Sequence, residues 1–526
     1  MSEAPTAIAL SLIAHTNVGK TALARTLLKR DVGEVRDDAH VTLVAERHTM
    51  IETLQGDTLC LWDTPGFGDS ARLARRLATL DRPIVGFLAM VWDRWREPAL
   101  WSSQQAMRNV RDDADVVLYL VNASETPSDA GYLAPELQIL EWLGKPVVAL
   151  LNQTGTPRTP AVEAAEIERW RQALGSRSWM HGVLALDAFA RCWVQERIWL
   201  RAVAGALSEA KQPAFARLAA AWQADSEAQF DAAMTAIAEP IARAACDRAP
   251  LPDAGLRGSL VEVGKAIGLA NDRVDPAKQV AMRTLADRLD ADTRSGMDRL
   301  IAIHGLDGRA AAEVMTRLAD SVTAEAPVDE RKAAVIGGFV SGALTGLAAD
   351  IASGGLTFGA GLLAGGIVGA VGAAGVARGF NLVRGKTQAS IRWSDEFVAA
   401  LVPAAVLRYL AVAHYGRGRG EWVASEYPPF WHDAVVDAVA RTGGVATIVA
   451  LRAADNCNVQ SLATAWQRKL REITLAVLAA LYPDAAPAAR SATIMATPPV
   501  RATASTTASR QNGGYSLATH SPRPRP

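Results

Sequence analysis

The sequence has few cysteines and no excess of charge of either sign. Its 526 residues include four cysteines, and none of them stands in a C-x-x-C pair. This scarcity excludes a disulfide framework and a cysteine-based zinc site, and it is typical of proteins from a reducing compartment. The 55 basic residues are balanced by 55 acidic ones, so no overall positive field indicates a nucleic-acid partner.

The N-terminus also lacks the pattern of a secretory signal. No basic segment followed by an apolar run precedes the first motif. We therefore expect the N-terminal region to lie in the cytosol. A chain of this length is expected to divide into several folding units.

The most informative stretch is a phosphate-loop pattern close to the start of the chain. An apolar run, residues 7–13, predicts a buried strand before it, and residues 21–30 after it have the apolar spacing of a helix. In this setting the backbone N–H groups of the loop and the helix dipole favour phosphate. The alternative is an ordinary helix start that happens to read Gly-Lys-Thr. The predicted loop consists of Ala14, His15, Thr16, Asn17, Val18, Gly19, Lys20 and Thr21.

Three residues of this loop have predicted roles in binding a nucleotide and its metal. Gly19 lets the backbone approach the phosphates closely. Lys20 can reach the β- and γ-phosphates, and Thr21 offers a hydroxyl ligand to Mg²⁺.

A second motif follows the next predicted strand. Residues 58–62 form a compact apolar run, and the sequence Asp63-Thr64-Pro65-Gly66 comes directly after it. At the carboxyl edge of a parallel sheet, Asp63 can hold a water bound to Mg²⁺. The Gly66 N–H can contact a γ-phosphate there.

Strands and helices alternate through the rest of this region. Residues 115–121 and 146–151 predict strands, and residues 135–143 predict the helix between them. This alternation indicates an α/β fold, a mostly parallel sheet with helices on both faces.

Two loops after the later strands are predicted to surround the base. Asn152 and Gln153 open a segment, ending at Gly155, that stands where a guanine-reading N-K-x-D motif would occur. A last strand at 182–186 leads to Asp187, in the loop expected to flank the base.

Residues 7–190 resemble the Era/TrmE-like GTPases. The resemblance is carried by Asn17-Val18-Gly19-Lys20-Thr21, by the Asp63 to Gly66 motif and by the strand that ends in Asn152. It implies GTP and Mg²⁺ as ligands and Thr42 as the switch I threonine. Thr21, Thr42 and Asp63 are then the metal-binding residues. The whole chain resembles bacterial GTPases that join such a domain to an uncharacterised, mostly helical C-terminal half.

Two departures from this family's pattern bear on activity. Gly155 replaces the aspartate that reads guanine, and the loss of such charge-assisted hydrogen bonds costs roughly 2–4 kcal/mol of discrimination. Phe67 stands where Ras-type enzymes have a glutamine that orients water, so slow hydrolysis is expected.

Asn17 matches the position at which Era/TrmE-like relatives can ligand a potassium ion. Lys20, Thr42, Gly66 and Asn17 are the residues that this resemblance assigns to hydrolysis. The alternative for Asn17 is that its side chain braces the loop through hydrogen bonds to the backbone.

The C-terminal half is predicted to be helical, with an unusual apolar segment. Residues 333–377 have one charged residue, Asp350, and glycines recur at every fourth position in two runs. Such spacing lets helices pack closely in membranes, and each run approaches the thickness of a bilayer's hydrocarbon core. Basic residues at both ends indicate a membrane hairpin with both ends on the cytoplasmic side. The alternative is a glycine-rich helical pair inside a soluble core.

The sequence therefore predicts an α/β P-loop GTPase domain followed by a largely α-helical region with a membrane hairpin. The expected segments are a GTPase domain at 1–200, helical domains at 201–330 and 389–484, the hairpin at 331–388, and a disordered tail at 485–526.

The predicted function is a GTP-binding protein with slow, Mg²⁺-dependent hydrolysis that acts as a switch on the cytoplasmic face of the bacterial inner membrane. It would bind the bilayer through residues 333–377 and act on a protein partner that the sequence does not identify. The first alternative is a nucleotide-binding scaffold with negligible turnover, and a cytoplasmic location is the alternative to the membrane. An RNA-linked role as in Era-like relatives lacks a basic aromatic patch in this sequence.

Overall fold

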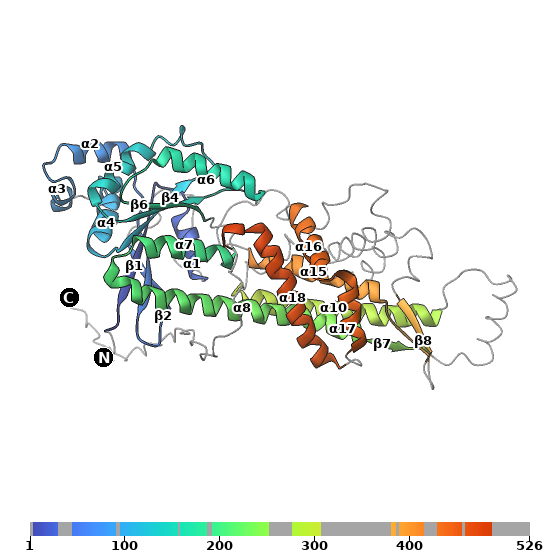
Figure 1. Cartoon of the computed structure of the whole chain (residues 1–526). Coiled ribbons are helices and arrows are strands. Elements are labelled where there is room, and N and C mark those ends of the chain that lie inside the picture. Colours follow the sequence, from blue (N-terminus) through green and yellow to red (C-terminus); the bar gives the residue numbers. More distant parts are fainter. Residues whose placement is uncertain are drawn as a thin grey trace, which may run out of the picture.

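The computed structural model describes residues 4–29, 45–90, 95–155, 158–186, 192–251, 276–306, 380–384, 389–414, 429–454 and 458–485. An α/β region forms one end of the molecule and a helical region forms the other (Figure 1). The predicted residues Thr42 and Asp187, the apolar segment 333–377 and the tail beyond residue 485 lie outside the described residues.

The α/β region is built on a six-stranded sheet with the order β2-β3-β1-β4-β5-β6. β2 runs antiparallel to β3, and the other neighbours pair in parallel. The predicted mostly parallel sheet is therefore confirmed. The strands are β1 (Ala7–Ala14), β2 (Glu46–Glu52), β3 (Thr58–Asp63), β4 (Val116–Asn122), β5 (Val147–Asn152) and β6 (Met180–Ala185).

Helices cover both faces of this sheet, as predicted. One face packs on α1 and on two later helices, and the other packs on the five helices α2 to α6. Because both faces are covered, β4 and β5 are apolar at nearly every position instead of alternating. The helices of the region are α1 (Lys20–Leu28), α2 (Ser70–Ala78), α3 (Pro83–Ala89), α4 (Pro98–Asp112), α5 (Leu133–Leu143) and α6 (Pro160–Leu174).

Two helices connect the α/β region to the rest of the chain. The helix α7 (Trp193–Ala206) and a short 3-10 turn, η1 (Glu209–Lys211), lead into the long helix α8 (Gln212–Cys246). The first part of α8 packs on the sheet with α1 and α7, and its second part enters the helical region. Figure 1 shows α8 as one continuous rod that runs from one end of the molecule toward the other.

The helical region forms a single core around α8, α10 and α18. Along α10 the apolar residues Met282, Leu285 and Leu289 are buried, while Arg283 and Asp287 are exposed. The predicted helical character of 201–330 and 389–484 is thus present in the described residues. The helices are α10 (Pro276–Ile303), α15 (Asp395–Ala413), α16 (Pro429–Arg441), α17 (Gly444–Ala454) and α18 (Val459–Leu481), followed by the turn η2 (Pro483–Ala485).

A small second sheet corrects the prediction for the edges of the helical segments. The strands β7 (Arg248–Pro250), β8 (Phe380–Arg384) and β9 (Ala389–Trp393) pair antiparallel in the order β7-β9-β8. β8 falls inside the predicted hairpin range 331–388, and β9 opens the predicted helical domain. In β9 Ile391 and Trp393 are buried and Ser390 and Arg392 less so, an alternation with the period of a strand.

No helix among the described residues is both long enough and apolar enough to cross a bilayer. The segment predicted to form the membrane hairpin, 333–377, lies outside the described residues. The membrane hairpin therefore stays a prediction.

Candidate nucleotide-binding site

The predicted phosphate loop connects β1 to α1 at the carboxyl edge of the sheet. Gly19 caps the helix with φ of 89°, a left-handed conformation that glycine adopts without strain. Asn17 also has a positive φ, 65°, which asparagine tolerates better than most residues, and its side chain is exposed. The loop therefore has the backbone curvature that a phosphate-binding turn needs.

Lys20, at the start of α1, points back under the loop. Its ammonium lies 3.4 Å from the carbonyl oxygen of His15, and the residue is buried. Burial lowers the pKa of Lys20, and the carboxylates of Asp63 and Glu136 oppose this effect by favouring the charged form. A partly desolvated cation of this kind interacts more strongly with an anion than a surface lysine does.

Gly66 lies directly against this lysine. A Cβ atom at position 66 would lie 2.8 Å from the Lys20 Nζ and 3.1 Å from the Thr16 Cα. Only glycine fits without a shift of the phosphate loop. The structure thus brings the second motif, which the sequence placed at the carboxyl edge of the sheet, into contact with the first.

Thr21 and Asp63 form the third part of the site. The Thr21 hydroxyl donates to Asp63 Oδ2 at 2.7 Å. Asp63 Oδ1 is buried and has no hydrogen-bond partner among the described residues. Burial raises the pKa of Asp63 to about 6, although the bond from Thr21 and the charge of Lys20 lower it. A buried carboxylate oxygen without a donor, beside a hydroxyl, is a set of hard oxygen atoms that fits Mg²⁺.

Asn152 ends β5 and is fully buried beneath the loop. Its Nδ2 donates to the carbonyl oxygen of Val18 at 2.7 Å, and a Cβ at Gly19 would lie 2.8 Å from the same atom. The side chain therefore braces the phosphate loop from the neighbouring strand. Its predicted part in the base pocket stays a prediction.

The segment after Asn152 curves away with two positive φ angles, 58° at Gln153 and 83° at Gly155. No atom of the described residues lies within 4 Å of the position of a Cβ at Gly155. Asp187, the other residue predicted near the base, lies outside the described residues.

Phe67 is fully buried in the core on one face of the sheet. Its N–H donates to the Ala14 carbonyl at 2.9 Å, and its carbonyl accepts from the Thr16 N–H at 3.1 Å. The residue after the Asp63 to Gly66 motif is therefore a fixed contact between that motif and the phosphate loop.

Sequence reasoning missed a buried carboxylate behind the loop. Glu136, in the first turn of α5, is fully buried and lies 2.9 Å from His15 Nδ1. A signal was present, because Glu136 falls on the same helical face as Leu133, Leu137 and Leu140, which is otherwise apolar. A charged residue on the apolar face of a buried helix indicates a specific partner.

The site is also linked to the long helix α8 by polar contacts. Lys29, which caps the end of α1, donates to Gln229 Oε1 at 3.1 Å. Asp57, in the turn between β2 and β3, is fully buried and accepts from Arg217 Nε at 2.7 Å. The end of α1 and the turn between β2 and β3 are thereby attached to α8, which continues into the helical region.

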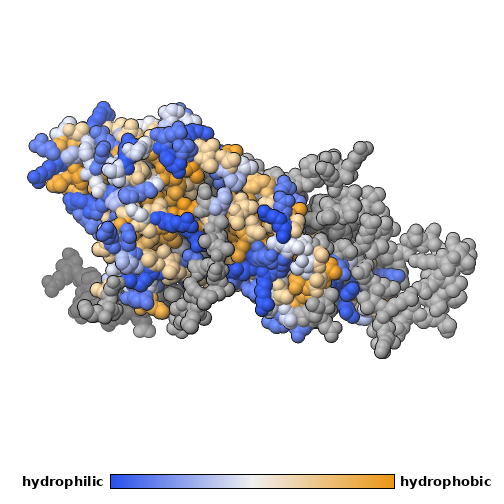
Figure 2. Space-filling model, in the orientation of Figure 1, coloured by the Kyte–Doolittle hydropathy of each residue, from blue (hydrophilic) through white to orange (hydrophobic). Residues whose placement is uncertain are grey.

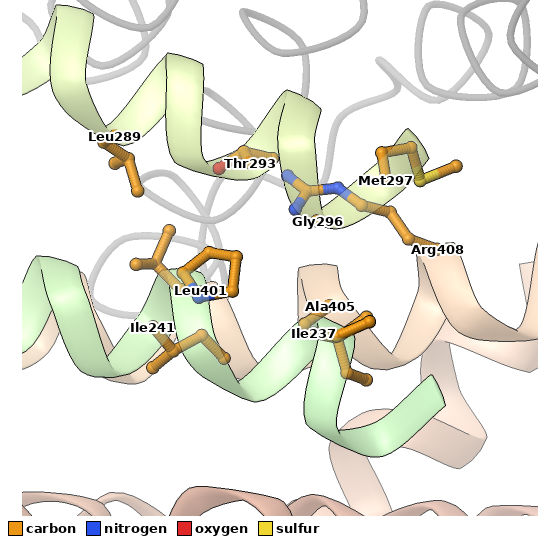
Figure 3. Close-up of a pocket in the computed structure, with 11 residues that line it drawn as sticks. Ile237, Ile241, Leu289, Thr293, Gly296, Met297, Leu401, Ala405 and Arg408 are labelled. Carbon is orange, nitrogen blue, oxygen red and sulfur yellow. The ribbon is translucent and has the colours of Figure 1, made fainter. Parts of the chain in front are cut away.

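A pocket in the helical region lies apart from these residues. It is lined by α8, α10 and α15, mostly with apolar side chains (Figure 3). Arg408 reaches from α15 toward Gly296 of α10, where a Cβ would lie 2.9 Å from the Ala236 carbonyl and from the ring of Pro240. Gly296 thus permits close packing of α10 on α8 beside this pocket.

The outer face of α2, the helix after the second motif, is basic. Arg72 and Arg75 are exposed, and Arg72 pairs with Glu97 at 3.0 Å. Figure 2 shows hydrophilic residues around a few hydrophobic ones at this end of the molecule. Val85 of α3 is one exposed apolar residue in this part of the chain, 53% accessible.

Two families match parts of the chain. Residues 10–153 match the family described as 50S ribosome-binding GTPase. Residues 171–435 match the family described as Domain of unknown function (DUF3482). No curated protein matches the chain. The first match, together with the mostly parallel sheet and the phosphate loop, shows that the N-terminal region is a P-loop GTPase domain.

Among solved structures, the chain is similar to Era in complex with MgGDPNP and nucleotides 1506–1542 of 16S ribosomal RNA, with 15% identity and a TM-score of 0.30. It is also similar to a variant of Aquifex aeolicus Era bound to GDP.AlF4⁻, with 17% identity and a TM-score of 0.27. Each similarity covers 39% of this chain and 58% of the Era chain. A structure of the chloroplast translocon components atToc33 and psToc159 matches with 16% identity and a TM-score of 0.23, over 36% of this chain and 72% of that one.

Proposed function

The chain belongs to the family described as Domain of unknown function (DUF3482), a description that names no activity, so we propose its function from the nucleotide-binding site. We propose that it binds GTP, hydrolyses it slowly with Mg²⁺ and acts as a switch at the cytoplasmic face of the bacterial inner membrane. The alternative is a nucleotide-binding scaffold at the membrane whose turnover is negligible. Both rest on the GTPase domain, and they differ in catalysis.

The observation that carries the proposal is the meeting of four groups at one sheet edge. The buried ammonium of Lys20 lies beside Gly66, and the Thr21 hydroxyl lies against the Asp63 carboxylate, whose Oδ1 has no partner in the part of the chain that the structure describes. Lys20 would attract the β- and γ-phosphates, and the Gly66 N–H would meet the γ-phosphate. These groups suit a triphosphate and its metal better than any other small anion.

Thr21 and Asp63 are the described residues that would hold Mg²⁺, with Thr42 as the further ligand that the family resemblance implies. Bound Mg²⁺ supplies positive charge that neutralises the phosphoryl oxygens as their charge develops. Its arrival would also satisfy the Asp63 oxygen that lacks a donor. The raised pKa of Asp63, about 6, describes the chain without an ion.

Slow hydrolysis is proposed because Phe67 is fully buried and apolar, so it cannot orient water. Asn17 is proposed to help instead through a potassium ion held against the phosphates by its side-chain carbonyl oxygen. Its exposed position at the tip of the loop supports this role. GTP turnover should then be faster in KCl than in NaCl at equal ionic strength, and Asn17→Ala should remove the difference. Equal rates in both salts would exclude potassium.

The membrane role is proposed from the uncharged, glycine-rich segment 333–377. Deleting this segment should turn a protein that pellets with vesicles into one that stays in the supernatant and still binds nucleotide. A full-length chain that is monodisperse without detergent and ignores vesicles would assign the segment to a soluble core and favour a cytoplasmic location.

The deciding experiment measures phosphate release over many turnovers, with and without lipid vesicles, for the wild type and Lys20→Ala. Lys20→Ala removes a buried charge, so we expect a folded protein without triphosphate binding. Lys278→Ala, which removes a lysine from α10, is the matched control and should behave as wild type. Wild-type binding of GTP without release above the Lys20→Ala level would select the scaffold. Wild-type affinity for GTP in Lys20→Ala would refute the nucleotide site itself.

A further inference from the structure

Three polar side chains converge on Glu136, a fully buried residue behind the phosphate loop. Glu136 Oε1 accepts from the Ser70 hydroxyl and lies 2.9 Å from His15 Nδ1, and Oε2 accepts from the Tyr119 hydroxyl at 2.8 Å. The His15 ring stacks on Tyr132 with the ring centres 4.7 Å apart. A fully buried carboxylate with this many donors has a fixed position.

Two of the three partners of Glu136, His15 and Ser70, come from the segments that carry the two phosphate-binding motifs, and the third, Tyr119, comes from β4. His15 belongs to the phosphate loop, and Ser70 is the first residue of α2, the helix that follows the Asp63 to Gly66 motif. The same two segments are also joined by the backbone bonds of Phe67 to Ala14 and Thr16. Gly66 therefore lies just before a stretch that is held to the phosphate loop at both Phe67 and Ser70.

We propose that Glu136 is a positioning residue that holds α2 to the phosphate loop through Ser70 and His15, and so presets the Gly66 N–H for the γ-phosphate. This inference rests on the proposed function. The inference adds selectivity to that function. The link through Glu136 should favour a triphosphate over a diphosphate, because only the triphosphate has a γ-phosphate for the Gly66 N–H to contact. The loop between Gly66 and Ser70 need not then be ordered by the ligand itself.

The arrangement of charge agrees with this role. The Glu136 carboxylate favours the charged form of Lys20, whose pKa burial lowers. Burial and the nearby carboxylate raise the pKa of Tyr119, so its hydroxyl keeps the proton that it donates. Glu136 thus supports the cation that binds the phosphates while its own oxygens are occupied by donors from β4, α2 and the loop.

The test compares Ser70→Ala with Ser103→Ala. Ser103 is also a buried serine of this domain, but its hydroxyl donates to a carbonyl within its own helix, α4. For each protein, the dissociation constants of GDP and of a non-hydrolysable GTP analogue are measured, together with the single-turnover rate with GTP and the thermal midpoint. Ser70→Ala should bind the analogue about tenfold more weakly and hydrolyse about tenfold more slowly, equivalent to about 1.4 kcal/mol. Its affinity for GDP should not change.

Glu136→Gln is the conservative variant. Its amide oxygen can still accept from Ser70 and His15, and its amide nitrogen can donate to the Tyr119 oxygen, so we expect the wild-type preference for triphosphate within about twofold. If Glu136 served only the packing of the domain, Ser70→Ala or Glu136→Gln would weaken GDP and the analogue equally and lower the thermal midpoint. That result would overturn the proposal.

The wild-type arm separates this inference from the proposed function. A wild-type chain that binds neither GDP nor the analogue would refute the proposed function, and the role of Glu136 with it. A wild-type chain that binds both, with an unchanged preference in Ser70→Ala, would refute only the role of Glu136. If the wild type binds without hydrolysis, the ratio of the two affinities still decides the question.

Discussion

Replacing Asn152 by alanine should weaken every nucleotide, whatever its base. The Asn152 amide is fully buried, and its bond to the Val18 carbonyl at 2.7 Å is a link from β5 to the phosphate loop. Without it the Val18 oxygen loses this buried donor. Because a nucleotide needs the loop in this conformation, the loss should appear in the binding free energy.

The expected size follows from the chemistry of that bond. Leaving a buried acceptor unsatisfied costs about 1–3 kcal/mol. At about 1.4 kcal/mol for each factor of ten, this weakens binding by about fivefold to 150-fold. Asn152 and Asn122 stand opposite each other at the ends of β5 and β4. Among the described residues, the Asn122 side chain bonds within its own turn, to Ser124 and Glu125. Asn122→Ala is therefore the matched control.

The assay is a titration of the wild type and of both variants with GDP and with ADP. Asn152→Ala should lose a similar factor for both nucleotides, and Asn122→Ala should lose little for either. A fall in GDP affinity with ADP unchanged would show that Asn152 reads the base instead of bracing the loop. Wild-type affinity for both nucleotides would show that the bond has no importance for binding.

Two further changes test neighbouring parts of the domain. Gly155→Asp puts a carboxylate where the N-K-x-D motif has one, at the cost of some backbone strain because φ is 83° there. Competition titrations should show a larger preference for GTP over ATP. An unchanged preference would mean that position 155 does not face the base. Arg217→Met leaves the buried carboxylate of Asp57 without its main partner. At pH 7 this change should lower the free energy of unfolding by about 2 kcal/mol. The loss is smaller than for a fully buried ion pair because the Arg217 side chain is 32% exposed. The bond from Arg217 holds the pKa of Asp57 below its ordinary value, so this contribution is present above the unfolded pKa, near 4, and is lost as the pH falls through the folded pKa. The thermal midpoints of the wild type and of Arg217→Met should therefore converge in acid. A difference between the two midpoints that is independent of pH would contradict the ion pair as its source.

The parts of the fold that the sequence predicted are those encoded locally. The strand before the phosphate loop and the strand that ends in Asp63 are each specified by an apolar run of a few residues. The same holds for the meeting of the two phosphate-binding motifs, because parallel strands place their carboxyl ends at one edge.

The parts that could not be predicted depend on residues far apart in the chain. β7 and β9 pair although about 140 residues separate Arg248 from Arg392, and three-residue β7 has too few positions to show a period. Glu136 lies 121 residues from His15, so no local pattern names its partner. The brace from Asn152 to Val18 is likewise a contact over 134 residues, and sequence reasoning placed that asparagine in the base pocket alone.

The continuity of α8 has a consequence for how the molecule unfolds. At about 1.5 Å per residue its 35 residues extend over about 50 Å. Phe215 and Leu218 belong to the core of the GTPase domain, and Phe230 and Met234 belong to that of the helical region. Unfolding of either half of α8 removes packing contacts from one core. It also destabilises the other half of the helix, which packs in the other core. The two regions should therefore lose structure in one cooperative transition, and a fragment that ends before α8 would expose the apolar surface that Phe215 and Leu218 cover.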